Sequence, residues 1–371
     1  MTYNELNTSS RVLMGPGPSD VHPRVLKAMA TPLIGHLDQE FVEIMDEVKS
    51  MVQQTLQTDN YLTFVVSAPG SAGMETCLVN LLEPGEEALI CIHGVFGGRM
   101  AEIAERCGAK VIKVEAPWGE PIDPEKVREA LERCNPKLVA IVHAETSTGV
   151  LQPLEEISKM THEAGALLMV DAVTSYCGVP LKVDEWGIDA IYSGTQKCLS
   201  APPGLSPVSF SERAVKALEN RKTKVQSWFL DLSLVKNYWG GAKRSYHHTA
   251  PVSSVYAIRE ALRLVLEEGL EARFDRHLKN HELLVSKLVG LGMEFLVKPE
   301  FRLPNLNAVV IPEGVDDLKV RTRLLNEYNI EIGGGLGNLT GKIWRIGLMG
   351  ESSTPNHVHM LVSALEKIIN D

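Results

Sequence analysis

Between residues 61 and 210, the chain alternates short apolar runs with longer segments of helical or Gly-rich character. Continuous apolar runs are typical of strands that are covered on both faces, as in parallel sheets. Helix-length segments between strands are the crossovers that parallel pairing requires. The pattern therefore predicts an α/β fold with a mostly parallel sheet. The expected strands cover residues 61–66, 87–92, 110–114, 137–142, 166–171, 190–192 and 205–210.

The two ends of the chain have a different texture. The first residues are polar and finish in Gly15-Pro16-Gly17-Pro18, which predicts an extended arm that packs on a partner subunit or, alternatively, a disordered tail. After residue 254, a long helical stretch precedes short strands and helices, which predicts a smaller α+β domain. We expect an N-terminal arm (1–18), a large domain (19–253) and a small C-terminal domain (254–371).

Composition narrows the class of protein. The 371 residues carry a formal net charge of −10, which argues against a nucleic-acid partner. No apolar run reaches the roughly eighteen residues that a membrane span needs, and the N-terminus lacks a signal-peptide pattern. None of the six cysteines forms a Cys-x-x-Cys pair, and most lie in apolar runs, so we expect reduced, buried thiols. These features predict a cytoplasmic protein that does not bind membranes.

A lysine and an aspartate follow two of the expected strands. The run 190–192 leads into a Gly- and Pro-rich loop that carries Lys197, and burial there would lower the pKa of the amine and free it to attack a carbonyl. Asp171 ends an apolar run 26 residues earlier, a gap typical of one crossover between parallel strands. Such a pair suits pyridoxal phosphate, because the carboxylate can pair with the pyridine nitrogen and the amine can hold the aldehyde. Alone, either residue would more often be a solvated loop residue or a helix cap.

Other candidate ligands follow neighbouring strands. Gly70 and Ser71 open a helix, where free backbone N–H groups can cradle a phosphate. The ring of Phe96 can stack on a pyridine, although core packing is the alternative for a single aromatic residue. Thr146 lies in a hydroxyl-rich turn that either bonds the phenolic oxygen of the cofactor or is an ordinary turn.

Two later segments offer groups for anions. Tyr246 and Thr249 flank a pair of adjacent histidines, which diverge and have no third ligand at metal spacing. We therefore expect hydroxyl contacts to a phosphate there and no metal site. Arg345 lies in an alternating strand, where it either faces solvent or, if it faces the site, matches a substrate carboxylate with its planar fork.

Taken together, these motifs resemble the class V aminotransferases of fold type I, and most closely the alanine–glyoxylate and serine–pyruvate aminotransferase group. The resemblance extends from Leu13 to Gly350. It implies a large domain with a mostly parallel seven-stranded sheet that binds pyridoxal phosphate, plus a smaller C-terminal α+β domain. The motifs that carry it are Ser193-Gly-Thr-Gln-Lys197, Ser147-Thr-Gly-Val-Leu-Gln-Pro153, Ala201-Pro-Pro-Gly204, Tyr246-His-His-Thr249 and Gly333-Gly-Gly-Leu-Gly337.

The resemblance assigns a role to the candidates in the large domain. Lys197 corresponds to the Schiff-base lysine, which also shuttles the proton, and Asp171 to the partner of the pyridinium nitrogen. Thr146 stands where the family has a serine that contacts the cofactor hydroxyl. Gln196 corresponds to a ligand of the cofactor phosphate.

The resemblance also implies a shared site. Tyr246 and Thr249 correspond to phosphate ligands that the other subunit donates, so a homodimer is expected. Arg345 corresponds to the residue that clamps the substrate carboxylate.

Three positions depart from the family pattern. Phe96 replaces a stacking tryptophan, and Pro69 lies in the phosphate turn, where it supplies no N–H. Ala144 stands where the near relatives usually have glycine. Ser71 still offers a hydroxyl, so these departures bear on substrate preference more than on the type of reaction.

The implied reaction is a ping-pong transamination from a small amino acid, alanine or serine, to glyoxylate or pyruvate. No second Arg or Lys is evident for a distal carboxylate, which favours small donors; another class V enzyme with a different small donor is the alternative. A cysteine desulfurase would need a nucleophilic Cys near the small domain, and no cysteine follows Cys198. A nicotinamide-dependent oxidoreductase would need a G-x-G-x-x-G turn, which is missing. A non-catalytic scaffold is disfavoured because Lys197 and Asp171 are both present.

Overall fold

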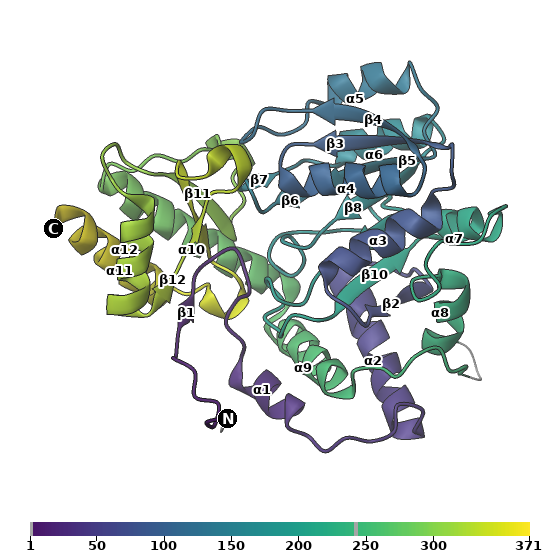
Figure 1. Ribbon diagram of the computed structural model, residues 1–371, viewed down its shortest axis with the longest axis horizontal. Helices are drawn as coiled ribbons and strands as arrows, with labels where there is room; N and C mark the ends of the chain where they lie inside the picture. The colour runs from purple at the N-terminus through teal and green to yellow at the C-terminus, as the bar shows by residue number, and fades with distance from the viewer. Residues whose placement is uncertain (1–2, 241–243) are drawn as a thin grey trace.

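The computed structural model describes residues 3–240 and 244–371. The strands at its centre are β2 (Leu62–Val66), β3 (Glu87–Ile92), β4 (Lys110–Glu115), β5 (Leu138–Val142), β8 (Leu167–Asp171), β9 (Ala190–Tyr192) and β10 (Ser206–Phe210). They form a seven-stranded sheet in the order β2-β10-β9-β8-β5-β3-β4 (Figure 1). Neighbours are parallel except at β10, which runs antiparallel to both β2 and β9. The expected α/β fold with a mostly parallel seven-stranded sheet is confirmed.

Every residue of β5 and β8 is buried, which shows that both faces of this sheet are covered. Two helices that follow β10, α7 (Glu212–Glu219) and α8 (Leu232–Trp239), were not expected from the sequence. The helices up to residue 268 are α1 (Pro23–Met29), α2 (Gln39–Leu56), α3 (Gly70–Leu81), α4 (Val95–Arg106), α5 (Pro124–Leu131), α6 (Glu155–Glu163), α7 (Glu212–Glu219), α8 (Leu232–Trp239) and α9 (Val252–Glu268). Within the described residues, no helix combines the length and apolarity needed to cross a bilayer.

Some helices begin with a side-chain cap, and α3 is among those that do not. Asp38 accepts a hydrogen bond from the amide of Glu40 at the start of α2 (2.9 Å), and Asp123 does the same for α5 before its first-turn proline. Helix α3 instead begins after Pro69, which has no side chain to cap it. Its first N–H groups therefore remain available to a ligand.

The C-terminal part has a core and a sheet of its own. Its three-stranded antiparallel sheet has the order β11-β14-β13, and Trp344 is fully buried in the second core. Its elements are α10 (Leu270–Gly290), β11 (Leu306–Val310), α11 (Asp317–Tyr328), β12 (Ile330–Glu331), β13 (Gly333–Gly334), β14 (Ile343–Gly347) and α12 (Pro355–Asn370). Helix α9 packs on α1 and α2, and its buried residues belong to the core of the central sheet. The domain boundary at residue 254 stays a prediction.

Short elements join these two parts. A hairpin of β6 (Ala144–Glu145) and β7 (Val150–Leu151) follows β5, and β1 (Val12–Leu13) lies near the N-terminus. Gly269, at φ +84°, separates α9 from α10. Single 3₁₀ turns cover Pro299–Phe301, Gly337–Leu339 and Gly350–Ser352.

Part of the N-terminal segment packs against the C-terminal part of its own chain. Residues 3–10 are exposed, but β1 pairs in parallel with β12, and the amide of Gly347 donates to the carbonyl of Met14 at 2.8 Å. The segment at β1 is extended, as predicted, and it pairs within its own chain. The bounds of the arm (1–18) and its packing on a partner subunit stay a prediction. The Gly-Pro repeat leaves this segment few N–H groups to satisfy, so it can run extended between the two sheets and pair through its carbonyls.

Gly347→Ala is expected to lower the thermal midpoint of unfolding, because a Cβ at this position would lie 2.0 Å from the carbonyl oxygen of Gly15. Forced overpacking of this kind costs about 1–3 kcal/mol. Gly290→Ala is the matched control, since no atom lies within 4 Å of its Cβ position at the end of α10. Equal midpoints for the two variants would contradict the close packing of the N-terminal segment.

Candidate active site

A cavity opens at the carboxyl ends of the central parallel strands. Asp171 pairs in register with Tyr192 of the neighbouring strand, so the residues that follow β8 and β9 lie side by side. The cavity encloses about 610 Å³, counting its open mouth, which is the size of an ordinary small-molecule site. The residues that line it are Pro69, Gly70, Ser71, Met74, Phe96, Arg99, Val142, Ala144, Thr146, Asp171, Val173, Tyr192, Gln196 and Lys197.

Lys197 has the environment that the sequence predicts for it. Its side chain is buried, with 8% of the residue exposed, and burial lowers the pKa of the amine to about 8, helped by the positive charge of Arg345. Its Nζ donates a hydrogen bond to the carbonyl of Pro16, in the N-terminal segment. Near neutral pH a useful fraction of this amine is therefore uncharged and nucleophilic.

Asp171 lies at the base of the cavity. Burial raises the pKa of its carboxyl to about 6, although the hydroxyl of Tyr192, the amide of Val173 and the charge of Lys197 all lower it. Tyr192 donates to Oδ2, and the amide of Val173 donates to Oδ1 at 2.8 Å. The carboxyl group is thus fixed in place, largely ionised at neutral pH, and able to accept a further hydrogen bond.

The uncapped start of α3 forms one wall of the cavity. Gly70 is buried there, and a Cβ on it would come within 3.3 Å of a methyl group of Val173, another lining residue. Gln196 faces the same cavity, and its buried Oε1 has no hydrogen-bond partner among the described residues. Ser71 is exposed at the cavity edge. This wall offers N–H and hydroxyl donors that suit a phosphate.

Two further lining residues supply the aromatic ring and the hydroxyl that were expected. Phe96 lies in the first turn of α4, and the guanidinium carbon of Arg99 is 5.0 Å from the centre of its ring. Thr146 is buried, and its hydroxyl bonds that of Thr174. Both lining residues, Phe96 and Thr146, belong to the same cavity as Lys197.

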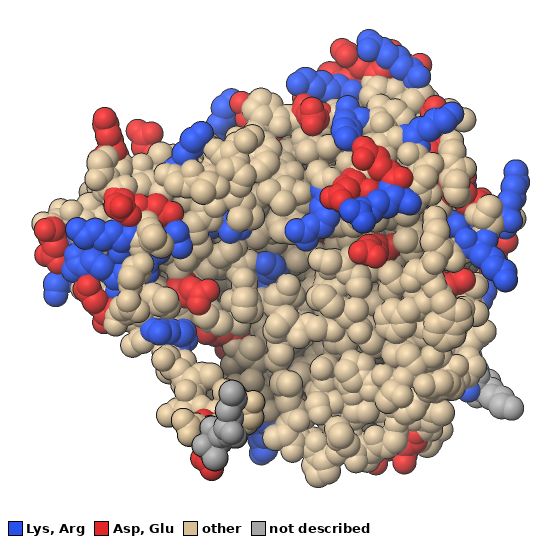
Figure 2. All heavy atoms as spheres, viewed as in Figure 1, with Lys and Arg blue, Asp and Glu red and all other residues tan. Residues whose placement is uncertain are grey.

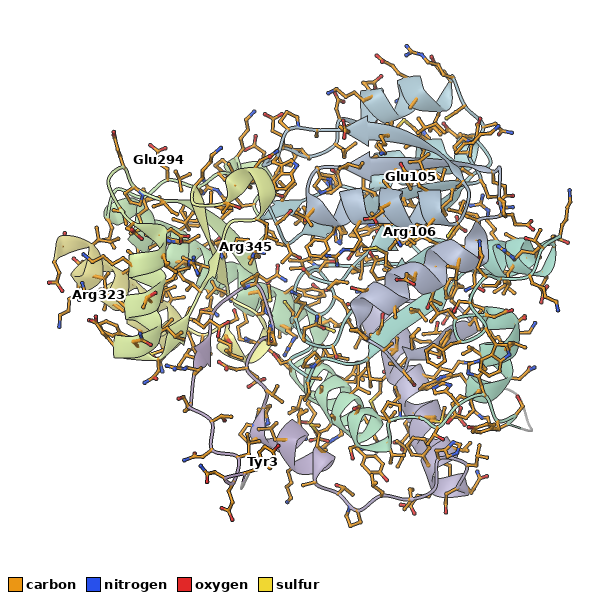
Figure 3. The ribbon with its side chains drawn as sticks, viewed as in Figure 1. Tyr3, Glu105, Arg106, Glu294, Arg323 and Arg345 are labelled. Carbon is orange, nitrogen blue, oxygen red and sulfur yellow. The ribbon has the colours of Figure 1, made fainter. Side chains whose placement is uncertain are left out.

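Arg345 is buried on β14 and points between the two sheets (Figure 3). Its Nε donates to the carbonyl of Gly334 at 2.8 Å and its Nη1 to the carbonyl of Thr146 at 3.3 Å. Burial lowers the pKa of its guanidinium to about 10, so it stays cationic at neutral pH. No carboxylate forms an ion pair with it among the described residues, and the alternative that it faces solvent is excluded.

Tyr246 and Thr249 do not reach the cavity of their own chain. Both are exposed, and neither lines the cavity. The adjacent histidines bond each other through Nδ1 at 2.8 Å, and His248 contacts the hydroxyl of Ser67 at 2.7 Å. No cluster of metal-binding side chains occurs in the part of the chain that the structure describes.

Sequence reasoning missed three polar residues of the site. Tyr192 holds Asp171, Arg99 lies over Phe96, and Glu145 accepts hydrogen bonds from the Phe96 amide (3.2 Å) and the Ser147 hydroxyl (2.6 Å). Burial raises the pKa of Glu145 to about 7. The position of Arg99, one helical turn after the aromatic residue, was a usable signal. Nothing local in the sequence marked the other two.

The donor set fits pyridoxal phosphate. The cavity combines a neutralisable amine, a fixed carboxylate on the neighbouring strand, an aromatic face and a phosphate-type helix start. The buried Oε1 of Gln196 has no partner among the described residues. The guanidinium of Arg345 bonds two backbone carbonyls but no carboxylate there, so it keeps its charge for an anionic ligand.

Comparisons with known proteins agree with this chemistry. A sequence profile described as Aminotransferase class-V matches residues 12–345. An alanine–glyoxylate aminotransferase of Rattus norvegicus is 44% identical over 367 residues, which cover 98% of this chain and 89% of the rat protein. A (S)-ureidoglycine–glyoxylate transaminase of Bacillus subtilis is 40% identical, with 98% of this chain and 92% of the relative covered.

Among solved structures, an alanine–glyoxylate aminotransferase from Nostoc sp. superposes with a TM-score of 0.98 at 49% identity, covering 100% of this chain and 98% of that one. The chain therefore belongs to the class-V aminotransferase family and is an aminotransferase that depends on pyridoxal phosphate.

Proposed function

We propose that this enzyme moves the amino group of a small amino acid, alanine or serine, to a small 2-oxo acid, glyoxylate or pyruvate, in a ping-pong reaction. The observation that carries the proposal is the buried amine of Lys197, which lines the cavity, together with the buried guanidinium of Arg345. The guanidinium bonds the carbonyl of the lining residue Thr146, and its charge lowers the pKa of the amine. The amine suits the reacting centre and the guanidinium suits an α-carboxylate. The relatives named above support glyoxylate as the acceptor.

A small donor fits the placement of charge. The structure brings one further cation to the cavity, Arg99, which the sequence analysis did not count. Its Nη1 lies 3.4 Å from the hydroxyl of Ser71, at the phosphate wall. It is thus not placed to receive a second carboxylate of a substrate that Arg345 holds.

The chain's residues would hold the cofactor at both ends. Lys197 would take its aldehyde and Asp171 its ring nitrogen, while Thr146 would meet the phenolic oxygen and Phe96 the face of the ring. Gly70, Ser71 and Gln196 would bind the phosphate. When bound, pyridoxal phosphate accepts the electron pair that stays on the substrate Cα after its proton leaves.

Lys197 is the group that moves this proton. Its pKa of about 8, set first by burial and then by the charge of Arg345, lies close to neutrality, where a general base works well. The ionised carboxylate of Asp171 keeps a protonated ring nitrogen favourable. Arg345 orients the substrate through its carboxylate, which keeps Cα within reach of the amine.

We further propose a homodimer in which Tyr246 and Thr249 of a second copy complete the phosphate site. Both side chains are exposed, close to exposed Trp228 and Phe229. Figure 2 adds that the face over α2, α3, α8 and α9 carries few charged side chains, whereas charges gather over α4, α5 and α11. An uncharged face with exposed aromatic residues is typical of a subunit interface.

Lys197→Ala is expected to abolish transamination, because no other group in the described cavity offers an amine. The loss should be at least about 10²–10⁴-fold, the usual contribution of a general acid–base residue. Steady-state turnover with alanine and glyoxylate is the measurement. Lys159→Ala, an exposed change on α6, serves as the control. Near wild-type turnover in Lys197→Ala would show that the assignment is wrong.

Arg345→Lys is expected to raise the KM for the amino acid roughly 10- to 100-fold, the effect of losing a charged, bidentate contact, with little change in cofactor affinity. Arg323→Lys is the matched control, because Arg323 lies on the outer side of α11 (Figure 3) and pairs with Glu327. If both variants leave the KM unchanged, Arg345 does not bind the substrate.

The rate at which the apoprotein captures pyridoxal phosphate is expected to rise with pH around a midpoint near 8, as the amine of Lys197 loses its proton. In Arg345→Gln the midpoint should move to higher pH, because a positive charge that lowers the lysine pKa has gone. Stopped-flow absorbance measures both profiles. A midpoint near the ordinary lysine value in the wild type, or an identical midpoint in the variant, would contradict the account.

A further inference from the structure

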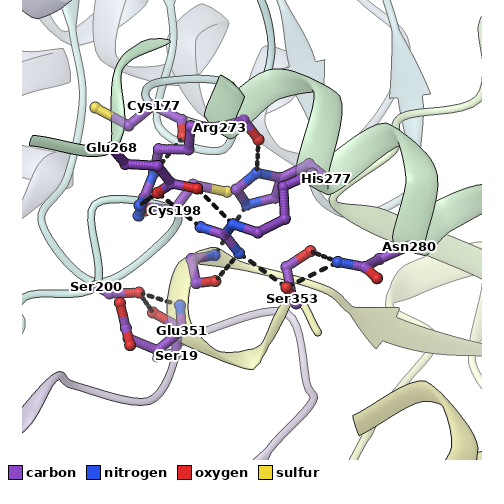
Figure 4. Close-up of polar contacts among 12 residues, drawn as sticks. Ser19, Cys177, Cys198, Ser200, Glu268, Arg273, His277, Asn280, Glu351 and Ser353 are labelled. Carbon is purple, nitrogen blue, oxygen red and sulfur yellow. Dashed lines mark hydrogen bonds and ion pairs between the residues drawn. The ribbon is translucent and has the colours of Figure 1, made fainter. Parts of the chain in front are cut away.

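A buried polar network lies behind the active site, on the first turns of α10 (Figure 4). It is built around Arg273, Arg276 and His277, with Glu268 from the end of α9 between the two arginines. Arg273 is 3% exposed and His277 is fully buried. Arg276 is half-buried. Burying the guanidinium of Arg273 is costly unless its contacts are specific.

Arg273 bridges the two loops that carry the reactive residues. Its Nη2 donates to the carbonyl of Cys198 at 2.6 Å, and Cys198 directly follows Lys197. Its Nε donates to the carbonyl of Cys177 at 3.1 Å, in the turn that follows β8 and Asp171. The planar fork therefore holds the loop after β9 and the loop after β8 at a fixed separation.

Arg276 and His277 hold a different segment, the turn that follows β14. The Nη1 of Arg276 donates to the carbonyls of Gly350 and Ser353 at 2.9 and 2.8 Å. The Nδ1 of His277 donates to the carbonyl of Arg273 at 2.8 Å, and its Nε2 accepts from the amide of Gly350 at 3.0 Å. This turn begins a few residues after Arg345, so it fixes the end of the strand that carries the arginine.

The two halves of the network meet at Ser200 and Gly350. A Cβ on Gly350 would lie 1.9 Å from the hydroxyl oxygen of Ser200, and the amide of Glu351 donates to that oxygen at 3.0 Å. Ser19 adds the N-terminal segment, because its hydroxyl donates to the carbonyl of Lys197 at 2.7 Å. The lysine loop and the turn after β14 are thus packed in direct contact.

Glu268 orients both guanidinium groups. Its carboxylate lies 2.5 Å from Nη1 of Arg273 and 2.5 Å from Nε of Arg276. Burial raises the pKa of this carboxyl, but the hydrogen bond from Arg276 and the charges of both arginines bring it down to about 2. The group therefore stays ionised throughout the range in which the enzyme can be assayed.

We propose that Arg273 is a positioning residue that sets the separation of the Lys197 amine from the Asp171 carboxylate, and that Arg276 is a positioning residue for Arg345. The inference rests on the proposed function, since it deepens the roles of Lys197, Asp171 and Arg345. It assigns the two arginines, which lie three residues apart on one helix, to different halves of the reaction. Arg273 acts on the cofactor side and Arg276 on the substrate side.

The matched variants Arg273→Lys and Arg276→Lys test this division. Each replaces one fork by a single ammonium group and weakens the same partner, Glu268. Cofactor affinity of the apoprotein is measured by fluorescence titration, the pH midpoint of cofactor capture by stopped flow, and the KM for alanine by steady-state kinetics. Thermal unfolding of each apoprotein reports on the fold.

Arg273→Lys is expected to weaken cofactor binding about tenfold and to shift the pH midpoint of capture, the scale of one lost charged hydrogen bond. Arg276→Lys is expected to raise the KM for alanine by a similar factor and to leave cofactor affinity and the pH midpoint unchanged. A purely structural network would lower both unfolding midpoints and change all these quantities together, and that result, or no change at all, would overturn the proposal.

Glu268→Gln keeps the test decisive if Arg273→Lys does not fold, because the carboxylate is partly exposed and its replacement leaves both forks in place. It should show both the cofactor effect and the KM effect, each smaller than in the arginine variants; an unchanged variant would overturn the proposal. Wild-type protein that neither binds pyridoxal phosphate nor transaminates would instead refute the proposed function itself.

Discussion

Burial of the Lys197 amine beside Asp171 is the constraint on which the rest of the site depends. An amine out of water loses part of its preference for a proton, and a carboxylate in the same cavity limits that loss. Two adjacent parallel strands, β8 and β9, supply both groups at one edge of the sheet because their carboxyl ends coincide. Both catalytic side chains therefore follow or end parallel strands. The antiparallel strand β10 lies on the other side of β9 and carries neither of them.

Two further segments pack beside this pair. The N-terminal segment contacts Lys197 through the carbonyl of Pro16, and a Cβ at Gly17 would lie 2.7 Å from the lysine Nζ. The C-terminal sheet brings Arg345, whose guanidinium bonds the carbonyl of Thr146 in the large part. The network around Arg273 then joins both segments to the lysine loop. Precise placement of reacting groups is worth several kcal/mol in catalysis, so contacts that fix the loops behind the site can affect the rate of the reaction.

Much of this arrangement can be predicted from the sequence. Apolar runs located the strands of the central sheet, and the spacing of Asp171 and Lys197 predicted their pairing, because both signals are local or repeat along the chain. The roles of Tyr192, Glu145 and Arg273, and the contact of Lys197 with the N-terminal segment, were missed. Their partners lie far away in sequence and are often backbone carbonyls, which have no signature in the sequence of side chains. For Arg345 the sequence left two orientations open, toward solvent or toward the site. The structure shows the side chain buried, so it does not face solvent.

The most direct test of the central claim is chemical. Borohydride reduction of the purified, cofactor-loaded protein, followed by digestion and mass spectrometry, identifies the lysine that bears the cofactor. The account predicts a pyridoxyl group on Lys197 and on no other lysine of the chain. A label on a different lysine, or no label on a protein that transaminates, would contradict it.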